Sequence, residues 1–188
     1  LGVREVFILT FLSWACCSCA SSLLIYYGTK DCSFLNALFE SVSALTTTGI
    51  SAIHNVESLP KSVLLWRAML QWVGGIGIIV MALTIFPILR IGGMQLFRSE
   101  FSDRSEKILP RVSQIAAAIL AVYSVFTVIG FFILNNLGMD KLEAFCHSAA
   151  AISTGGLTTR DAGILAFDSV NIEIVLIILM LIGGSPVS

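Results

Sequence analysis

Charged residues are scarce in this sequence. They make up 12% of its 188 residues, against about 25% in ordinary soluble domains. A soluble fold of this length needs far more polar surface, so the scarcity argues against a protein surrounded by water. Apolar residues fill 56% of the chain, and lipid is the solvent that suits such a surface. The sequence therefore predicts an all-α integral membrane protein.

Several chemical signatures are also missing. Basic residues are scattered rather than interleaved with aromatic ones, so we expect no nucleic-acid partner. The chain has neither a CxxC pair nor the Cys/His spacing of a metal site, so no metal centre built from these side chains is expected. A disulfide between Cys32 and Cys146 is a remote alternative to two free thiols.

Motifs of intramembrane enzymes are absent as well. Neither GxSxG nor HExxH occurs in the sequence. The acids Glu40, Glu143 and Glu173 lack a partner at catalytic spacing. We therefore expect neither catalysis nor a cofactor.

Three apolar segments are long enough to cross the membrane, which takes about 20 residues. They are Val6–Tyr27, Val63–Leu89 and Val112–Leu134. A fourth, Ile172–Ile182, is short and stops at a Gly-Gly-Ser-Pro sequence. We expect this end to be truncated or to bend inside the membrane, and the start without methionine indicates that residues precede Leu1.

Two shorter apolar stretches are typical of re-entrant helices. Phe34–Thr47 and Leu142–Thr154 each hold about a dozen mostly apolar residues and then break at glycine, at Gly49 and at Gly155-Gly156. Broken backbone at membrane depth is tolerated only inside protein or against water, because lipid cannot bond to free N–H and C=O groups. Two such breaks indicate a polar pathway.

The densest basic cluster lies between the second and third spans, in the loop 90–111. The positive-inside rule makes this loop cytoplasmic, and Arg4 agrees with that orientation. Both re-entrant segments then open from the outer side.

The chain also contains an internal repeat at a shift of 107 positions. The identical residues Leu35, Ala37, Ser41, Ala44, Thr47, Gly49 and Gly77 then pair with Leu142, Ala144, Ser148, Ala151, Thr154, Gly156 and Gly184. Chance does not match helix ends and glycine breaks together. We therefore expect a first pore repeat at 1–89, a cytoplasmic linker at 90–111 and a second, C-terminally truncated pore repeat at 112–188, each repeat reading span, re-entrant pore loop, span.

The glycine breaks have the composition of a cation filter. Such filters replace the ion's water shell with backbone carbonyls, which requires glycines and small hydroxyl residues near the pore axis. The sequences Thr46-Thr47-Thr48-Gly49 and Ser153-Thr154-Gly155-Gly156 meet that requirement, and they are the first and second filter segments of this prediction. The helix before each segment ends where its dipole favours a cation. The alternative interpretation is close helix packing or an ordinary loop.

Other polar and glycine positions have plainer interpretations. His54 is expected in a loop, and His147 as a packed, hydrogen-bonded histidine. Glu40, the repeat partner of His147, either helps to hold the filter or attracts cations. The run Gly74–Gly77 is expected to be a bend or a packing site rather than a ligand site.

Four stretches resemble the Trk/Ktr/HKT superfamily of potassium transporters, most closely its bacterial Trk branch. Ser41–Ser51 (SVSALTTTGIS) is similar to the first filter of the family, and His147–Ala162 (HSAAAISTGGLTTRDA) to the second. Trp66–Val80 (WRAMLQWVGGIGIIV) and Ile91–Glu100 (IGGMQLFRSE) are similar to an inner helix and its cytoplasmic link.

The resemblance implies potassium uptake across a bacterial inner membrane, with sodium passed by some members. It also implies a homodimer and a cytoplasmic nucleotide-binding regulatory subunit. Carried over to this sequence, the potassium ligands are the backbone carbonyls of Thr46, Thr47, Thr48, Gly49, Ser153, Thr154, Gly155 and Gly156.

One departure from the family is the number of repeats. The family has four pore repeats in one chain, and this sequence holds the two that resemble the N-terminal half. Either the chain is a truncated or split product, which we favour, or two copies surround one axis. The alternative function is a non-conducting or degenerate membrane fragment of such a transporter.

Overall fold

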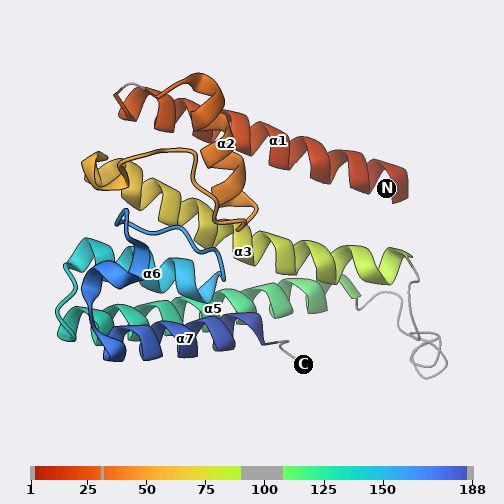
Figure 1. Cartoon of the computed structure of the whole chain (residues 1–188). Coiled ribbons are helices and arrows are strands. Elements are labelled where there is room, and N and C mark those ends of the chain that lie inside the picture. Colours follow the sequence, from red (N-terminus) through yellow and green to blue (C-terminus); the bar gives the residue numbers. More distant parts are fainter. Residues whose placement is uncertain (1–2, 31, 90–107, 186–188) are drawn as a thin grey trace.

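A computed structural model describes residues 3–30, 32–89 and 108–185 of the chain, and every regular element within them is helical (Figure 1). In chain order these elements are α1 (Val3–Gly28), α2 (Phe34–Leu45), η1 (Val56–Ser58), α3 (Lys61–Leu89), α5 (Ile108–Asn136), α6 (Lys141–Ile152), η3 (Gly163–Phe167) and α7 (Val170–Gly184).

The long helices confirm the three predicted membrane spans. Segments of α1, α3 and α5 are long and apolar enough to cross a bilayer: Arg4–Gly28, Lys61–Met81 and Ala116–Asn136. Helix α7 is apolar but has only 15 residues. The long helices and α7 run roughly alongside one another in Figure 1.

The short helices α2 and α6 lie between the longer ones (Figure 1). Helix α2 packs between α1 and α3, while α6 packs against α3, α5 and α7. Ser33 caps the start of α2, where its hydroxyl accepts a hydrogen bond from the Asn36 N–H at 3.1 Å. Each short helix has 12 residues and ends two residues before the predicted re-entrant stretch does. Each short helix therefore ends directly before its predicted filter segment.

The two halves superpose in sequence with two different shifts. The bounds of α2 and α6 are 107 positions apart, as the repeat predicts. The first residues of α3 and α7, Lys61 and Val170, are 109 positions apart. We call α3 and α7 the inner helices of the first and second half. The second half thus carries two more residues between α6 and α7 than the first half carries between α2 and α3.

This change of register corrects one predicted pairing. Gly77 does not correspond to Gly184, because Gly74 and Gly183 hold the equivalent places. A Cβ at Gly74 would collide with the carbonyl oxygen of Leu45, the last residue of α2. A Cβ at Gly183 would collide with the carbonyl oxygen of Ile152, the last residue of α6. Each inner helix therefore touches the end of its own short helix through a glycine.

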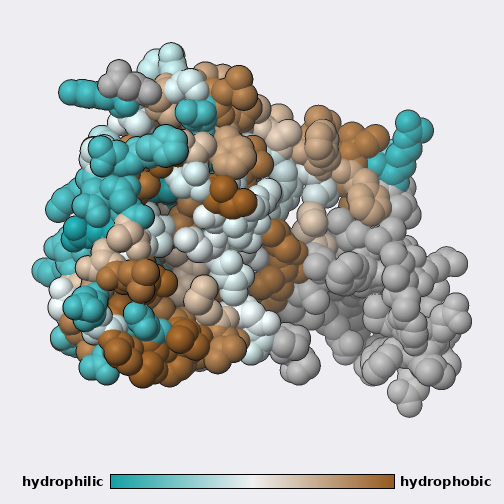
Figure 2. All heavy atoms as spheres, in the orientation of Figure 1, coloured by the Kyte–Doolittle hydropathy of each residue, from teal (hydrophilic) through white to brown (hydrophobic). Residues whose placement is uncertain are grey.

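The outside of the helix bundle is largely apolar. Large side chains such as Phe11 and Phe132 are 73% and 57% exposed, which suits contact with lipid. Hydrophilic residues gather over the end of the molecule where α1 and α5 finish and α3 and α7 begin (Figures 1 and 2). Residues 90–107 of the predicted linker lie outside the described residues, and residues 108–111 belong to α5.

Candidate filter segments and their surroundings

The first filter segment begins at the end of α2 and turns through two left-handed residues. Thr47 has φ of 55° and Gly49 has φ of 75°. The N–H of Thr48 donates to the carbonyl of Ser43 at 2.9 Å, and the N–H of Thr46 donates to that of Val42 at 2.9 Å. A left-handed threonine costs about 1–2 kcal/mol, and such strain concentrates at functional sites.

The second filter segment has the same backbone geometry. Thr154 has φ of 51° and Gly156 has φ of 86°. The N–H of Gly155 donates to the carbonyl of Ala150 at 2.8 Å, as its counterpart Thr48 does in the first segment. The two segments thus repeat one backbone geometry, residue by residue, 107 positions apart.

The two segments lie against each other. A Cβ on Gly49 would collide with the carbonyl oxygen of Gly155 and would lie 3.2 Å from the Cα of Gly156. Gly49 is therefore required twice, once by its positive φ and once by the neighbouring backbone. The structure thus brings the two predicted segments together although they are far apart in the sequence.

The glycine run of α3 packs against both short helices, in agreement with the packing interpretation. Gly74 touches the end of α2, as described above, and a Cβ on Gly75 would lie 2.9 Å from the Cβ of Ser153. Small residues at these places let the helix backbone approach the start of the second filter segment.

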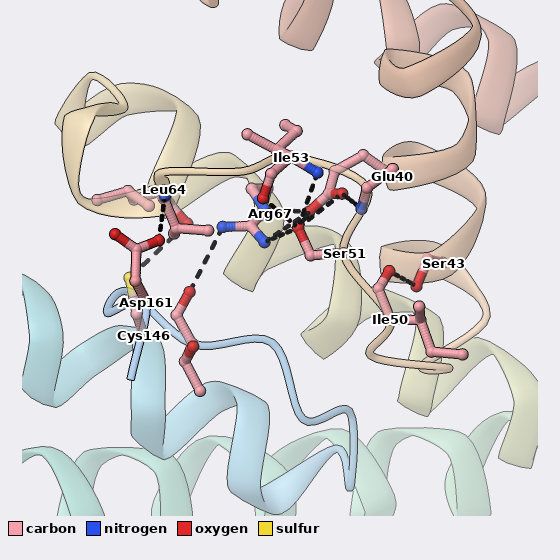
Figure 3. A network of polar contacts seen from close by, with 12 residues as sticks. Glu40, Ser43, Ile50, Ser51, Ile53, Leu64, Arg67, Cys146 and Asp161 are labelled. Atoms are coloured by element: carbon pink, nitrogen blue, oxygen red, sulfur yellow. Dashed lines mark hydrogen bonds and ion pairs between the residues drawn. The ribbon is translucent and has the colours of Figure 1, made fainter. Parts of the chain in front are cut away.

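Behind the first filter segment lies a buried ion pair. Glu40 and Arg67 are 0% and 2% exposed, and the Arg67 Nε donates to Glu40 Oε1 at 2.7 Å. Glu40 Oε2 also accepts from the Ser51 hydroxyl and from the Ala52 N–H, both at 3.0 Å. Figure 3 shows Glu40, Ser51 and Arg67 pointing toward one another. The carboxylate is therefore fully engaged in holding the chain that leaves the first segment.

Arg67 also reaches the second half. Its Nη1 donates to the carbonyl of Thr158, which follows the second filter segment, at 3.4 Å. Its Nη2 lies 3.3 Å from the Ser51 hydroxyl. One guanidinium thus connects the chain leaving the first segment to the chain leaving the second, and the Glu40 carboxylate is occupied by donors of the protein.

The counterpart of Glu40 behind the second segment is His147. Its Nε2 lies 3.4 Å from the Thr159 hydroxyl, and its ring meets Phe167 edge-on at 5.3 Å between centroids. It is 3% exposed, as the packing interpretation expects. Beside it is a hollow of about 30 Å³, lined by His147, Ala150, Ala151, Gly156, Leu157, Thr158, Ile164, Leu176 and Met180.

A second ionic cluster lies nearer the surface. The Arg160 Nε donates to Glu143 Oε1 at 2.6 Å, and its Nη1 lies 3.7 Å from Glu57 Oε2. The hydrogen bond to Glu143 and the charge of that carboxylate raise the pKa of Arg160. Asp161 accepts from the Val56 N–H at 2.6 Å, so this cluster also joins the two halves.

The cysteines form no disulfide. Cys32 and Cys146 are free thiols, so the remote alternative of a bridge between them is wrong. The Cys146 thiol lies 3.8 Å from the carbonyl of Leu64 instead (Figure 3). Among the described residues, no group of three or more His, Cys, Asp or Glu side chains is placed to hold a metal.

Sequence reasoning missed two residues of this site, Arg67 and Gln71. Arg67 lies in the middle of an apolar stretch, and a charge inside a membrane segment pairs with another polar group as a rule. The matching acid Glu40 lies in another apolar stretch, so that rule was the available signal. Gln71 is completely buried one helical turn beyond Arg67.

Three comparisons relate this chain to known proteins. The TrkH family model, described as a cation transport protein, matches residues 1–186. The chain is 44% identical over 163 residues to the Trk system potassium uptake protein TrkI of Halomonas elongata, and 40% identical over 187 residues to TrkH of Escherichia coli K12. It resembles the crystal structure of the potassium transporter TrkH from Vibrio parahaemolyticus with a TM-score of 0.81 and 35% identity.

These matches cover most of this chain and a minor part of each relative. The aligned region is 87% of the chain and 33% of TrkI, and 98% of the chain and 39% of the Escherichia coli protein. The solved structure is matched over 97% of the chain and 36% of its own length. The chain therefore spans between a third and two fifths of the length of its relatives.

Proposed function

Because this chain belongs to the TrkH family of cation transport proteins, we propose that it supplies two of the filter segments of a potassium uptake pore. The observation that carries the proposal is the pair of adjoining segments with one backbone geometry, Thr46–Gly49 and Ser153–Gly156. The relatives named as potassium uptake proteins support potassium as the transported ion.

The mechanism follows from backbone chemistry. A potassium ion sheds its water onto the carbonyls of Thr46, Thr47, Thr48, Gly49, Ser153, Thr154, Gly155 and Gly156, and onto further segments around the same axis. Helices α2 and α6 end directly before these carbonyls, so the negative ends of their dipoles favour a cation there. Left-handed residues alternate with other residues along each segment. Neighbouring carbonyls therefore do not all point along one direction, as they would in a helix.

The rest of the chain then serves the pore. In this proposal residues 1–89 and 112–188 are two pore repeats, and the segment 90–111 links them on the cytoplasmic side. The protein crosses a bacterial inner membrane with its filter facing outward. A homodimer and a cytoplasmic nucleotide-binding regulatory subunit are the partners that the family resemblance implies. Transport needs neither catalysis nor a cofactor.

Growth at limiting potassium tests the proposal. A strain lacking its own potassium uptake systems receives the chain alone, or a chimera in which the chain replaces the matching region of Escherichia coli TrkH. We expect the chimera to restore growth. Rescue by the chain alone would mean that two copies complete a pore.

The matched control is the same chimera carrying Gly49→Ser. The added side chain meets both the positive φ and the Gly155 carbonyl, so potassium uptake should be lost, and any uptake that remains should select poorly against sodium. A wild-type chimera that reaches the membrane and fails to transport potassium would contradict the proposal and favour a non-conducting fragment.

A further inference from the structure

Gln71 is a buried amide without a hydrogen-bond partner among the described residues. It lies in α3, its side chain is 0% exposed, and neither Oε1 nor Nε2 is bonded. Leaving such a group unpaired in a protein interior is costly. A glutamine in this place therefore calls for a role that an apolar residue of similar size does not fill.

The amide lies directly against the second filter segment. A Cβ on Gly155 would lie 2.5 Å from Cδ, 2.6 Å from Nε2 and 2.9 Å from Oε1 of Gln71, and these are the three heavy atoms nearest to that position. The amide occupies the place where any side chain at residue 155 would go. This contact explains why residue 155 is glycine, whereas its counterpart in the first segment is Thr48.

Gln71 belongs to a stripe of α3 that follows the second filter segment. Arg67, Gln71 and Gly75 are four residues apart and so share one face of the helix. Arg67 bonds to the carbonyl of Thr158, Gln71 meets Gly155, and Gly75 meets Ser153. The inner helix of the first half therefore backs the filter segment of the second half from its exit to its start.

The second inner helix carries different residues on the same stripe. With the shift of 109 positions, Arg67 corresponds to Leu176, Gln71 to Met180 and Gly75 to Gly184. Methionine resembles glutamine in length and shape but has no amide. Methionine is therefore the apolar substitution at residue 71 that tests the role of the amide.

We propose that Gln71 is a positioning residue that determines the ion specificity of the second filter segment, an inference that rests on the proposed function above. Its amide blocks retreat of the Gly155 backbone from the pore axis. Its unpaired donor and acceptor lie beside the peptide groups that flank Gly155, and a hydrogen bond to one of them while an ion is bound holds the carbonyls toward the axis. The filter carbonyls thereby keep the spacing that suits potassium, and one half of the chain sets the selectivity of the other.

The test is Gln71→Met in the chimera described above. We measure potassium uptake, its competition by sodium, and the amount of protein in the membrane. We expect a near-normal amount and a potassium-over-sodium preference reduced roughly 2- to 13-fold, the range for one neutral hydrogen bond. The matched control is Val73→Met, because Val73 lies in the same helix and is 51% exposed; it should change neither readout.

Unchanged selectivity in a well-expressed Gln71→Met protein would overturn the inference, as would a lower amount of protein with normal selectivity. If Gln71→Met does not accumulate, the double variant Gln71→Ala/Gly155→Ala decides, because its new Cβ takes the space of the removed amide. Normal selectivity in that variant would overturn the inference too. Failure of the wild-type chimera to transport potassium would instead contradict the proposed function.

Discussion

A charged network stands behind the first filter segment, whereas a small hollow lined mostly by apolar side chains stands behind the second. Glu40 and Arg67 in the first half correspond to His147 and Leu176 in the second. The backbone of the two segments is nevertheless the same in its left-handed residues and in its hydrogen bonds to the preceding helix.

This difference separates the contacts that form the turn of each segment from the contacts that hold the segment in place. The turn is formed locally, by hydrogen bonds to the last turn of the short helix and by a left-handed glycine three residues after the helix's C-cap residue, Thr46 or Ser153. The residues behind each segment, its backing, are not local, because they connect the segment to other helices. Two unlike backings therefore hold one backbone, and substitutions in the two regions should have effects of different kinds.

The largest effect is expected from a Cβ in either segment. In the chimera, Gly49→Ala adds a side chain that collides with the Gly155 carbonyl, and uptake of potassium should be lost. Among the described residues, only the Gly49 Cα lies within 4 Å of a Cβ on Gly156, at 3.9 Å. If a further filter segment packs there in the complete pore, Gly156→Ala should abolish uptake as well.

Gly138→Ala is the control for both variants. Gly138 also has a positive φ, 105°, but no atom lies within 4 Å of its added Cβ. That variant carries only backbone strain of about 1–3 kcal/mol and should still transport. Normal uptake by Gly156→Ala would show that the complete pore leaves Gly156 uncrowded.

A smaller effect is expected when the first backing is converted into the second. Arg67→Leu alone leaves Glu40 buried without its cation, which typically costs about 3–5 kcal/mol. The double variant Glu40→His/Arg67→Leu installs the pair that the second half uses and removes the unpaired charge. We expect the double variant to accumulate in membranes and to resist heating in detergent better than Arg67→Leu does. Equal losses would mean that the two backings are not interchangeable.

The smallest effect is expected at the surface cluster. The Arg160 side chain is 40% exposed, and exposed ion pairs contribute less than about 1 kcal/mol. Arg160→Gln should therefore lower the melting temperature in detergent slightly at low ionic strength, and less so in choline chloride, which screens the pair without supplying potassium. A large loss that salt does not change would show that Arg160 has a role beyond its ion pairs.

Much of the fold was predictable because its signals are local. Hydrophobic length predicted the spans α1, α3 and α5, and a dozen apolar residues before a glycine predicted α2 and α6. The repeat paired Thr47 with Thr154 and Gly49 with Gly156, and the two residues of each pair share a positive φ. These features depend on residues within one helix or one turn.

The contacts behind the segments were not predictable in the same way. Glu40 and Arg67 are 27 positions apart, and only the folded bundle shows that they meet. The pairing of Gly77 with Gly184 was wrong because two extra residues lie between α6 and α7, and a single shift cannot represent an insertion. Gln71 gave no signal at all, since a lone glutamine in an apolar helix has many possible partners.

The bond between Arg67 and Thr158 has a consequence for how the protein is made. The two residues are 91 positions apart, so at typical synthesis rates Arg67 leaves the ribosome roughly 5 to 20 s before Thr158 does. During that interval the first segment has neither the Gly155 backbone beside it nor the bond from Arg67 to Thr158. The contacts of the first segment are therefore complete only after the second half of the chain has been inserted into the bilayer.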